Sequence, residues 1–197
     1  IQNKTHNQVI QVGHIERYNP ATKLDFIDKN EITEIKTKRT GIINERNKKS
    51  SLVLDLMIHD IDLIMQMIDS KIQSISSTQK KTNTSESIIT NIAFKNETKA
   101  QLIAERGVKV NNSREMILQL RDKKIEIDFI NRTQKHTTQK MKQTELQLDI
   151  NVNPLKMELL EFYNNIINQT PPTVGIQEAC EAVSIALKIE QLSKSND

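Results

Sequence analysis

An apolar segment in the first third of the chain carries side chains that could move protons. Residues 52–62 read L-V-L-D-L-M-I-H-D-I-D. In a helix each residue turns the chain by about 100°, so Asp55, His59, Asp62 and Gln66 fall within one narrow stripe. An aspartate four residues before a histidine can fix the imidazole and tune its pKa, which suits general acid–base chemistry. The pattern therefore predicts either a proton-handling pair or a polar stripe that faces water.

The rest of this segment predicts a helix that is packed on most of its sides. Apolar residues continue to residue 68 and cover nearly all of the surface outside the stripe, and only Asp60 interrupts them. Ser50 and Ser51 stand where an N-cap is expected. A helix with so little polar surface must lie against other elements, so its polar stripe opens on solvent or on a cleft.

Composition bounds the class of protein. The 197 residues are 36% hydrophobic and 27% charged, which fits a soluble chain of one domain, or of one domain and part of a second. Aromatic residues make up 3%, so aliphatic side chains must build the core. The net charge is +3 and the cations are scattered, so nucleic-acid binding is not predicted. No signal peptide or membrane span is recognisable, and a cytoplasmic location is expected.

The single cysteine and the first residue add two expectations. Cys180 lies among small apolar residues of a predicted helix, which predicts a buried thiol with no disulfide and no nucleophilic role. The chain starts with Ile1 where an initiator methionine would stand, which predicts a start inside a longer protein.

Hydrophobic periodicity predicts an α+β fold, with an open, mainly antiparallel sheet and helices on one face. The second face, rich in Ile, Thr and Val, predicts a homo-oligomer. Strands are expected at residues 9–12, 32–40, from 72 onward, 88–95, 101–106, 115–120, 124–130 and 145–150. Helices are expected at residues 20–29, 52–68, 153–170 and 175–192, a polar loop at 41–50, and a long hairpin tip or loop at 134–143.

Three blocks of sequence together resemble a known family. They are V-G-H-I-E-R-Y-N-P-A at residues 12–21, V-L-D-L-M-I-H-D-I-D at 53–62, and N-P-L-K-M-E-L-L-E-F at 153–162, followed by P-P-T-V-G-I-Q-E-A at 171–179. Their order and spacing are similar to the carboxyl-terminal half of the glucose–fructose oxidoreductase, inositol dehydrogenase and MocA family. The first two blocks most resemble the branch that oxidises the 3-hydroxyl of UDP-N-acetylglucosamine-type nucleotide sugars, which belongs to cell-envelope and lipopolysaccharide sugar metabolism.

The resemblance implies part of a two-domain enzyme. Its amino-terminal Rossmann domain would bind NAD or NADP, and its carboxyl-terminal domain would hold the substrate and mediate oligomerisation. Residues 1–18 would be the last Rossmann strand and a linker, and residues 19–197 the substrate domain. The resemblance implies no metal site.

The resemblance also implies roles for individual residues. The family's D-x-x-x-H pair matches Asp55 and His59, which makes His59 the acid–base group near the sugar hydroxyl and Asp55 its partner or a substrate contact. Arg17 and Asn19 would line the substrate or cofactor side of the cleft, and Arg46 is a candidate for the pyrophosphate.

The parts of the family that hold the cofactor are missing. No G-x-G-x-x-G and no E-K-P occurs, and the chain has four glycines in all. No residue is therefore assigned to NAD(P), and this chain alone is not expected to bind it. Two hypotheses follow: part of a nucleotide-sugar dehydrogenase that is completed elsewhere, or a non-catalytic oligomerisation module or remnant of a split gene.

Overall fold

A computed structural model describes residues 8–194, and eight strands within them form one open sheet. The strand order is β2-β3-β4-β1-β5-β6-β7-β8, and every neighbouring pair is antiparallel except the parallel pair of β1 and β4. The strands are β1 (Ile32–Ile42), β2 (Ile72–Lys81), β3 (Ser85–Phe94), β4 (Lys99–Gly107), β5 (Ser113–Leu120), β6 (Lys123–Asp128), β7 (Thr133–Thr138) and β8 (Gln143–Gln147).

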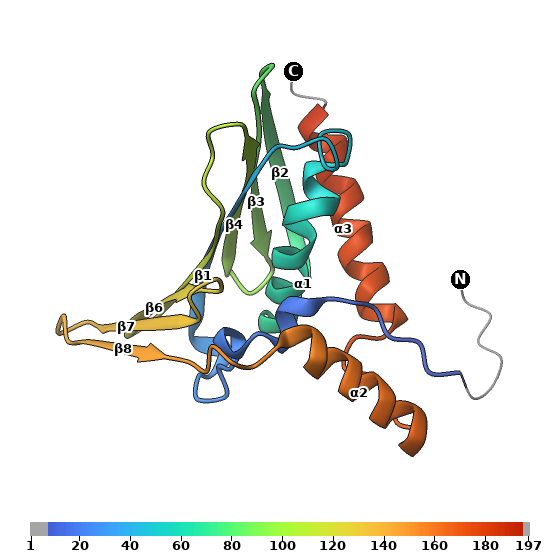
Figure 1. Cartoon of the computed structure of the whole chain (residues 1–197). Coiled ribbons are helices and arrows are strands. Elements are labelled where there is room, and N and C mark those ends of the chain that lie inside the picture. The colour runs from blue at the N-terminus through green and yellow to red at the C-terminus, as the bar shows by residue number, and fades with distance from the viewer. Residues whose placement is uncertain (1–7, 195–197) are drawn as a thin grey trace.

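Strand β1 joins two antiparallel meanders. One is β2-β3-β4 and the other is β5-β6-β7-β8, and the second turns away from the first in Figure 1. Along β1 the side chains alternate, so that Ile35, Thr37 and Arg39 are buried while Lys36 and Lys38 are exposed. The alternation places a guanidinium group on the covered face of the sheet.

Two helices cover that face. They are α1 (Ile58–Met67), which is preceded by the π-helical turn η4 (Val53–Met57), and α3 (Ile176–Lys194), which contacts both β2 and α1. Helix α2 (Pro154–Asn168) lies apart from the sheet and packs on the short 3-10 helix η1 (Ile15–Tyr18) (Figure 1). The core between sheet and helices is aliphatic and includes Ile35, Leu102 and Leu118 of the sheet with Ile61, Ile64 and Ile189 of the helices. The predicted α+β class with helices on one face is confirmed.

The expected cap of α2 is present. The Asn153 side chain accepts a hydrogen bond from the amide of Lys156 at 3.2 Å, and Pro154 occupies the first helical position. The helix ends at Asn168, and the residue after it, Gln169, has a left-handed φ of 53° and is followed by two prolines at residues 171 and 172.

The amino-terminal region differs from the prediction. Residues 9–12 are not a strand, although Val12 donates its amide hydrogen to the carbonyl of Val174 at 3.0 Å. The helix predicted at 20–29 is limited to two 3-10 turns, η2 (Pro20–Thr22) and η3 (Lys29–Glu31). The Gln134 side chain donates hydrogen bonds to the carbonyl groups of Ala21 and Lys23. In a continuing helix these carbonyl groups would accept from backbone amides instead. Residues 1–7 of the predicted linker lie outside the described residues.

Two further details differ from the prediction. The polar stretch 134–143 is a hairpin tip only at residues 139–142, because β7 pairs with β6 and β8 along its length. Cys180 is exposed rather than buried, because α3 turns Ala179 and Ala182 toward the core and Cys180 lies about 100° around the helix from Ala179. Among residues 8–194, no helix combines the length and apolarity that crossing a bilayer requires.

Candidate functional site

His59 lies in the first turn of α1, directly after the π-helical turn η4. The side chain is partly buried, and its Nδ1 atom is enclosed without a hydrogen-bond partner among the described residues. Burial, together with the positive charge of Arg39, lowers the pKa of His59 to about 4. The imidazole is therefore neutral at pH 7 and available to accept a proton.

A buried ionic network lies beside His59. Arg39 donates from Nη1 to Oε1 of Glu16 at 2.8 Å, and from Nη2 and Nε to Oδ1 of Asp60 at 2.8 and 3.2 Å. The side chains of all three residues are at most 4% exposed. Arg114 of β5 donates to the same Glu16 oxygen at 3.1 Å, but its side chain is 51% exposed. Since buried charges must be paired, this network fixes η1, β1 and α1 relative to one another.

The two carboxyl groups of the network differ in their proton affinity. Burial acts to raise the pKa of Glu16, but the charge and hydrogen bonds of Arg39 hold that pKa below its ordinary value. Burial raises the pKa of Asp60 even against the same guanidinium group. Glu16 is therefore the more firmly ionised partner of Arg39.

A second cluster joins η1 to α1. Arg17 donates two hydrogen bonds to the Asp62 carboxylate, from Nε at 2.8 Å and from Nη2 at 2.6 Å. Its Nη1 donates to the carbonyl of Thr173 at 3.1 Å. His14 is 5% exposed, and its Nδ1 lies 3.8 Å from the Asp62 carboxylate. The His14 ring stands edge-on to the His59 ring, with centroids 6.3 Å apart and planes at 82°. Two imidazoles and one carboxylate are thus grouped at the start of α1.

Asp55 is held by a different partner from the one that the sequence suggests. Arg106, whose side chain is 1% exposed, donates from Nη1 to Asp55 at 3.1 Å and to the Ser50 hydroxyl at 3.0 Å. Over residues 8–194, the structure shows no hydrogen bond between Asp55 and His59. Arg106, which points inward from β4, therefore binds the Asp55 carboxylate in place of His59. The Asp55 side chain remains 38% exposed.

The predicted substrate residues occupy contrasting positions. Asn19 is buried: its Oδ1 accepts from the amide of Ala21 at 3.0 Å, and its Nδ2 donates to Glu16 at 3.1 Å and to the Phe129 carbonyl at 3.0 Å. Arg46 lies on the exposed loop between β1 and η4. The structure thus groups Arg17 and Asn19 around η1, next to α1, and leaves Arg46 apart. Contact of these residues with a substrate stays a prediction.

The sequence reasoning did not single out His14, Glu16, Arg39 and Arg114. The signal for Arg39 was available, because period-two alternation puts it on the same strand face as Ile35. His14 and Glu16 stand within the block at 12–21, but nothing in their spacing indicates that they meet α1. Their role depends on long-range packing.

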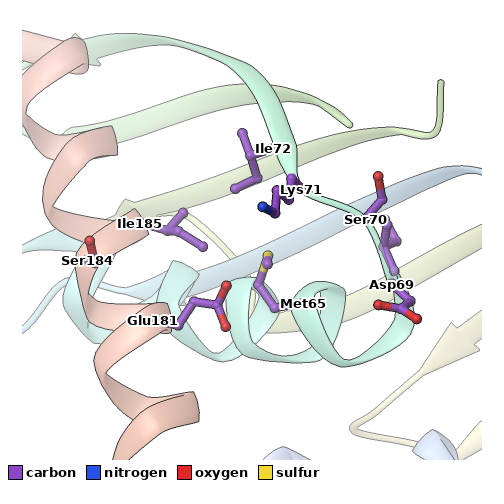
Figure 2. A pocket seen from close by; sticks show the side chains of 9 residues that line it. Met65, Asp69, Ser70, Lys71, Ile72, Glu181, Ser184 and Ile185 are labelled. Carbon is purple, nitrogen blue, oxygen red and sulfur yellow. The ribbon is translucent and has the colours of Figure 1, made fainter. Parts of the chain in front are cut away.

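A cleft of about 650 Å³ lies elsewhere, between the end of α1, the start of β2 and α3. Figure 2 shows Met65 and Ile185 in its wall, with Asp69, Lys71 and Glu181 around it. None of the predicted site residues lines this cleft. Within the part of the chain that the structure describes, no three His, Cys, Asp or Glu side chains are grouped to hold a metal ion. The candidate functional site is therefore the region around His59, where the titratable side chains are grouped, rather than this cleft.

Comparisons with known proteins identify the fold. Neither a protein-family model nor a curated protein matches the sequence. Among solved structures, UDP-N-acetylglucosamine 3-dehydrogenase GnnA from Acidithiobacillus ferrooxidans matches with a TM-score of 0.88 and 22% identity over 95% of this chain. Aldose-aldose oxidoreductase from Caulobacter crescentus matches with a TM-score of 0.78 and 13% identity over 96% of this chain. Myo-inositol 2-dehydrogenase from Lactobacillus plantarum matches with a TM-score of 0.75 and 17% identity over 97%.

The chain accounts for only part of these dehydrogenases. It covers 62% of the first structure, 63% of the second and 64% of the third. At such identities the likeness shows the fold. The chain has the fold of the carboxyl-terminal part of dehydrogenases of the glucose–fructose oxidoreductase, inositol dehydrogenase and MocA type, as its three sequence blocks predicted.

Proposed function

We propose that this chain is the substrate-binding part of an NAD(P)-dependent oxidoreductase that oxidises a hydroxyl of a nucleotide sugar, the 3-hydroxyl of a UDP-N-acetylglucosamine-like compound. The observation that carries the proposal is His59, a neutral and partly exposed imidazole set between two ionic clusters. The fold likeness to a UDP-N-acetylglucosamine 3-dehydrogenase supports it.

In this proposal His59 takes the hydroxyl proton of the sugar. Oxidation of an alcohol requires loss of that proton, and a neutral imidazole is the side chain best suited to accept it near pH 7. Asp55 acts as a substrate contact, because its carboxylate keeps partial exposure while Arg106 holds it in place. A carboxylate in this position accepts hydrogen bonds from sugar hydroxyl groups.

Two arginines suit the diphosphate of such a substrate. Arg46 is exposed on its loop, and Arg114 is anchored through one nitrogen to Glu16 while half of its side chain remains exposed. A guanidinium group offers paired donors that match phosphate oxygens. Arg17 and Asn19 keep η1 in place through their bonds to Asp62 and to Glu16 and the Phe129 carbonyl, and in this proposal they face the substrate.

The described residues do not fit a dinucleotide cofactor. A phosphate cradle needs free amide groups at a glycine-rich turn before a helix. The one glycine directly before a described α-helix is Gly175, and its amide already donates to the Glu178 carboxylate at 3.0 Å. That negative charge would repel a phosphate. The nicotinamide would be bound outside the described residues.

We also propose that the open face of the sheet forms a homo-oligomer. Ile89, Ile103 and Ile117 lie on this face among polar side chains such as Lys36 and Gln101, and each is at least partly exposed. An apolar strip with a polar surround is typical of a subunit contact. Multi-angle light scattering tests this directly, and a strictly monomeric chain would count against it.

Ligand titration by NMR tests the substrate proposal on the chain as it exists. UDP-N-acetylglucosamine, UDP alone and N-acetylglucosamine alone are each added to the ¹⁵N-labelled protein. We expect amide shifts at η1, η4 and the first turn of α1 with the nucleotide sugar. His59→Gln should weaken this binding about tenfold through loss of one hydrogen bond.

His136→Gln is the matched control, because His136 lies on β7 and binds Gln134. It should leave the affinity unchanged. Shifts that gather around the cleft of Figure 2, or no binding at millimolar ligand, would refute the assignment. The second result would favour the alternative of a non-catalytic oligomerisation module.

A further inference from the structure

Two imidazoles in the site each have one buried nitrogen atom without a hydrogen bond within residues 8–194. The Nδ1 atoms of His14 and His59 are both enclosed without a hydrogen bond from the described residues. A buried polar atom left without a partner is costly, so such atoms call for an explanation. Neither the fold nor the role of His59 as a proton acceptor accounts for the presence of His14.

The geometry couples the two rings. Their centroids are 6.3 Å apart and their planes are nearly perpendicular. A water molecule can bridge polar atoms across such a gap. On its other side, His14 has Nδ1 at 3.8 Å from Asp62. The carboxylate is fixed by the two hydrogen bonds from Arg17.

The charges around the pair favour a proton on His14 rather than on His59. Burial lowers the pKa of His14, and Arg17 of η1 adds to this, but the Asp62 carboxylate of α1 opposes both by attracting a positive charge on His14. His59 instead faces Arg39 of β1 and Arg114 of β5, with only Glu16 of η1 in compensation. The remaining titratable groups that bear on this region are Asp60, bound to Arg39, and Glu178 and Tyr18, near Arg17.

We propose that His14, backed by Asp62, receives through one water molecule the proton that His59 takes from the substrate hydroxyl. The O–H bond of the sugar breaks, its electron pair stays on oxygen, and the proton passes to His59 and on to His14. His14 acts through His59 and is therefore a positioning residue. The carboxylate that stabilises a positive charge on the histidine pair is then Asp62, because Asp55 is hydrogen-bonded to Arg106. This inference rests on the proposed function only for the identity of the substrate.

Imidazole titration by NMR tests the coupling without substrate or cofactor. The chain has four histidines, so single His→Gln variants assign every signal in a long-range ¹H–¹⁵N spectrum. In His14→Gln, the titration midpoint of His59 should rise by roughly one pH unit, because a like charge is removed. In Asp62→Asn, the midpoint of His14 should fall by a similar amount. Asp55→Asn should leave both midpoints in place.

The outcomes are separable. A His59 midpoint that stays fixed in a folded His14→Gln variant, or a His14 midpoint unmoved by Asp62→Asn, overturns the inference. The two variants test the pair independently, so misfolding of one does not remove the test. Coupled histidines in a chain that binds no nucleotide sugar would reject the proposed function alone. Binding with uncoupled histidines would reject this inference alone.

Discussion

Replacement of Arg39 by methionine tests whether the buried ionic network holds the site together. Methionine keeps most of the side-chain volume and removes the charge and three hydrogen bonds, one to Glu16 and two to Asp60. Both carboxylates would then be buried without their common cation. Breaking a buried ion pair from one side costs about 3–5 kcal/mol, because the remaining charge cannot be solvated.

This loss is large against the whole stability of a domain, which is about 5–15 kcal/mol. Urea unfolding followed by circular dichroism measures it. With a slope of about 2 kcal/mol per molar urea, the midpoint should fall by roughly 2 M. Without Arg39, the pKa values of Glu16 and Asp60 would be raised in the folded state. Both carboxyl groups are protonated at a pH below their unfolded pKa, and the folded state then bears no penalty from them. As the pH rises above that value they ionise more readily in the unfolded state, and the folded state is destabilised. The deficit of Arg39→Met should therefore shrink on acidification.

Arg114→Met is the matched control. Arg114 donates to the same Glu16 oxygen, but half of its side chain is in solvent, so the substitution should cost less than about 1 kcal/mol. Equal losses from the two substitutions would show that the desolvation argument for Arg39 is mistaken.

Three other outcomes follow from the structure. His59 is protonated near pH 6.5 when unfolded and only near pH 4 when folded, so its depressed pKa should reduce stability by up to about 3 kcal/mol as pH falls through that window; thermal unfolding of His59→Gln should lack this part of the pH dependence. Arg106→Met should destabilise the fold by more than Asp55→Asn, since the arginine is buried and the aspartate partly exposed, and similar urea midpoints would contradict this. Cys180 should react with a thiol reagent in native buffer as fast as in urea, and protection in the native state would contradict its exposed position.

The sequence was most informative where a pattern is local. Alternation and helical periodicity identified most strands and three of the helices, and the Asn-Pro signal placed the start of α2 at Asn153. The same signal at Asn19 predicted a helix that does not form beyond one turn. The side chain of Gln134, far along the chain, donates hydrogen bonds to the carbonyl groups that would continue it. A competing long-range hydrogen bond leaves no trace in local periodicity.

The candidate site was predictable only in part for the same reason. Spacing singled out His59, and alternation could have revealed Arg39 and Arg106 as inward-facing side chains. Nothing local shows that Arg106 rather than His59 meets Asp55, or that His14 lies beside α1. Those contacts depend on which strands become neighbours, and only the assembled sheet decides that.

The central position of β1 has a kinetic consequence. Each meander is built from hairpins whose strands are close in sequence, so each closes short loops and can form early. The parallel pairing of β1 with β4 spans two intervening strands and α1, and its antiparallel pairing with β5 spans three strands; these two pairings together join the meanders. Arg39 lies on β1, so its bonds to η1 and α1 form only when this slow junction closes. The proton-handling site should therefore form late in folding. Substitutions in β1 should slow its formation more than substitutions in β7 or β8.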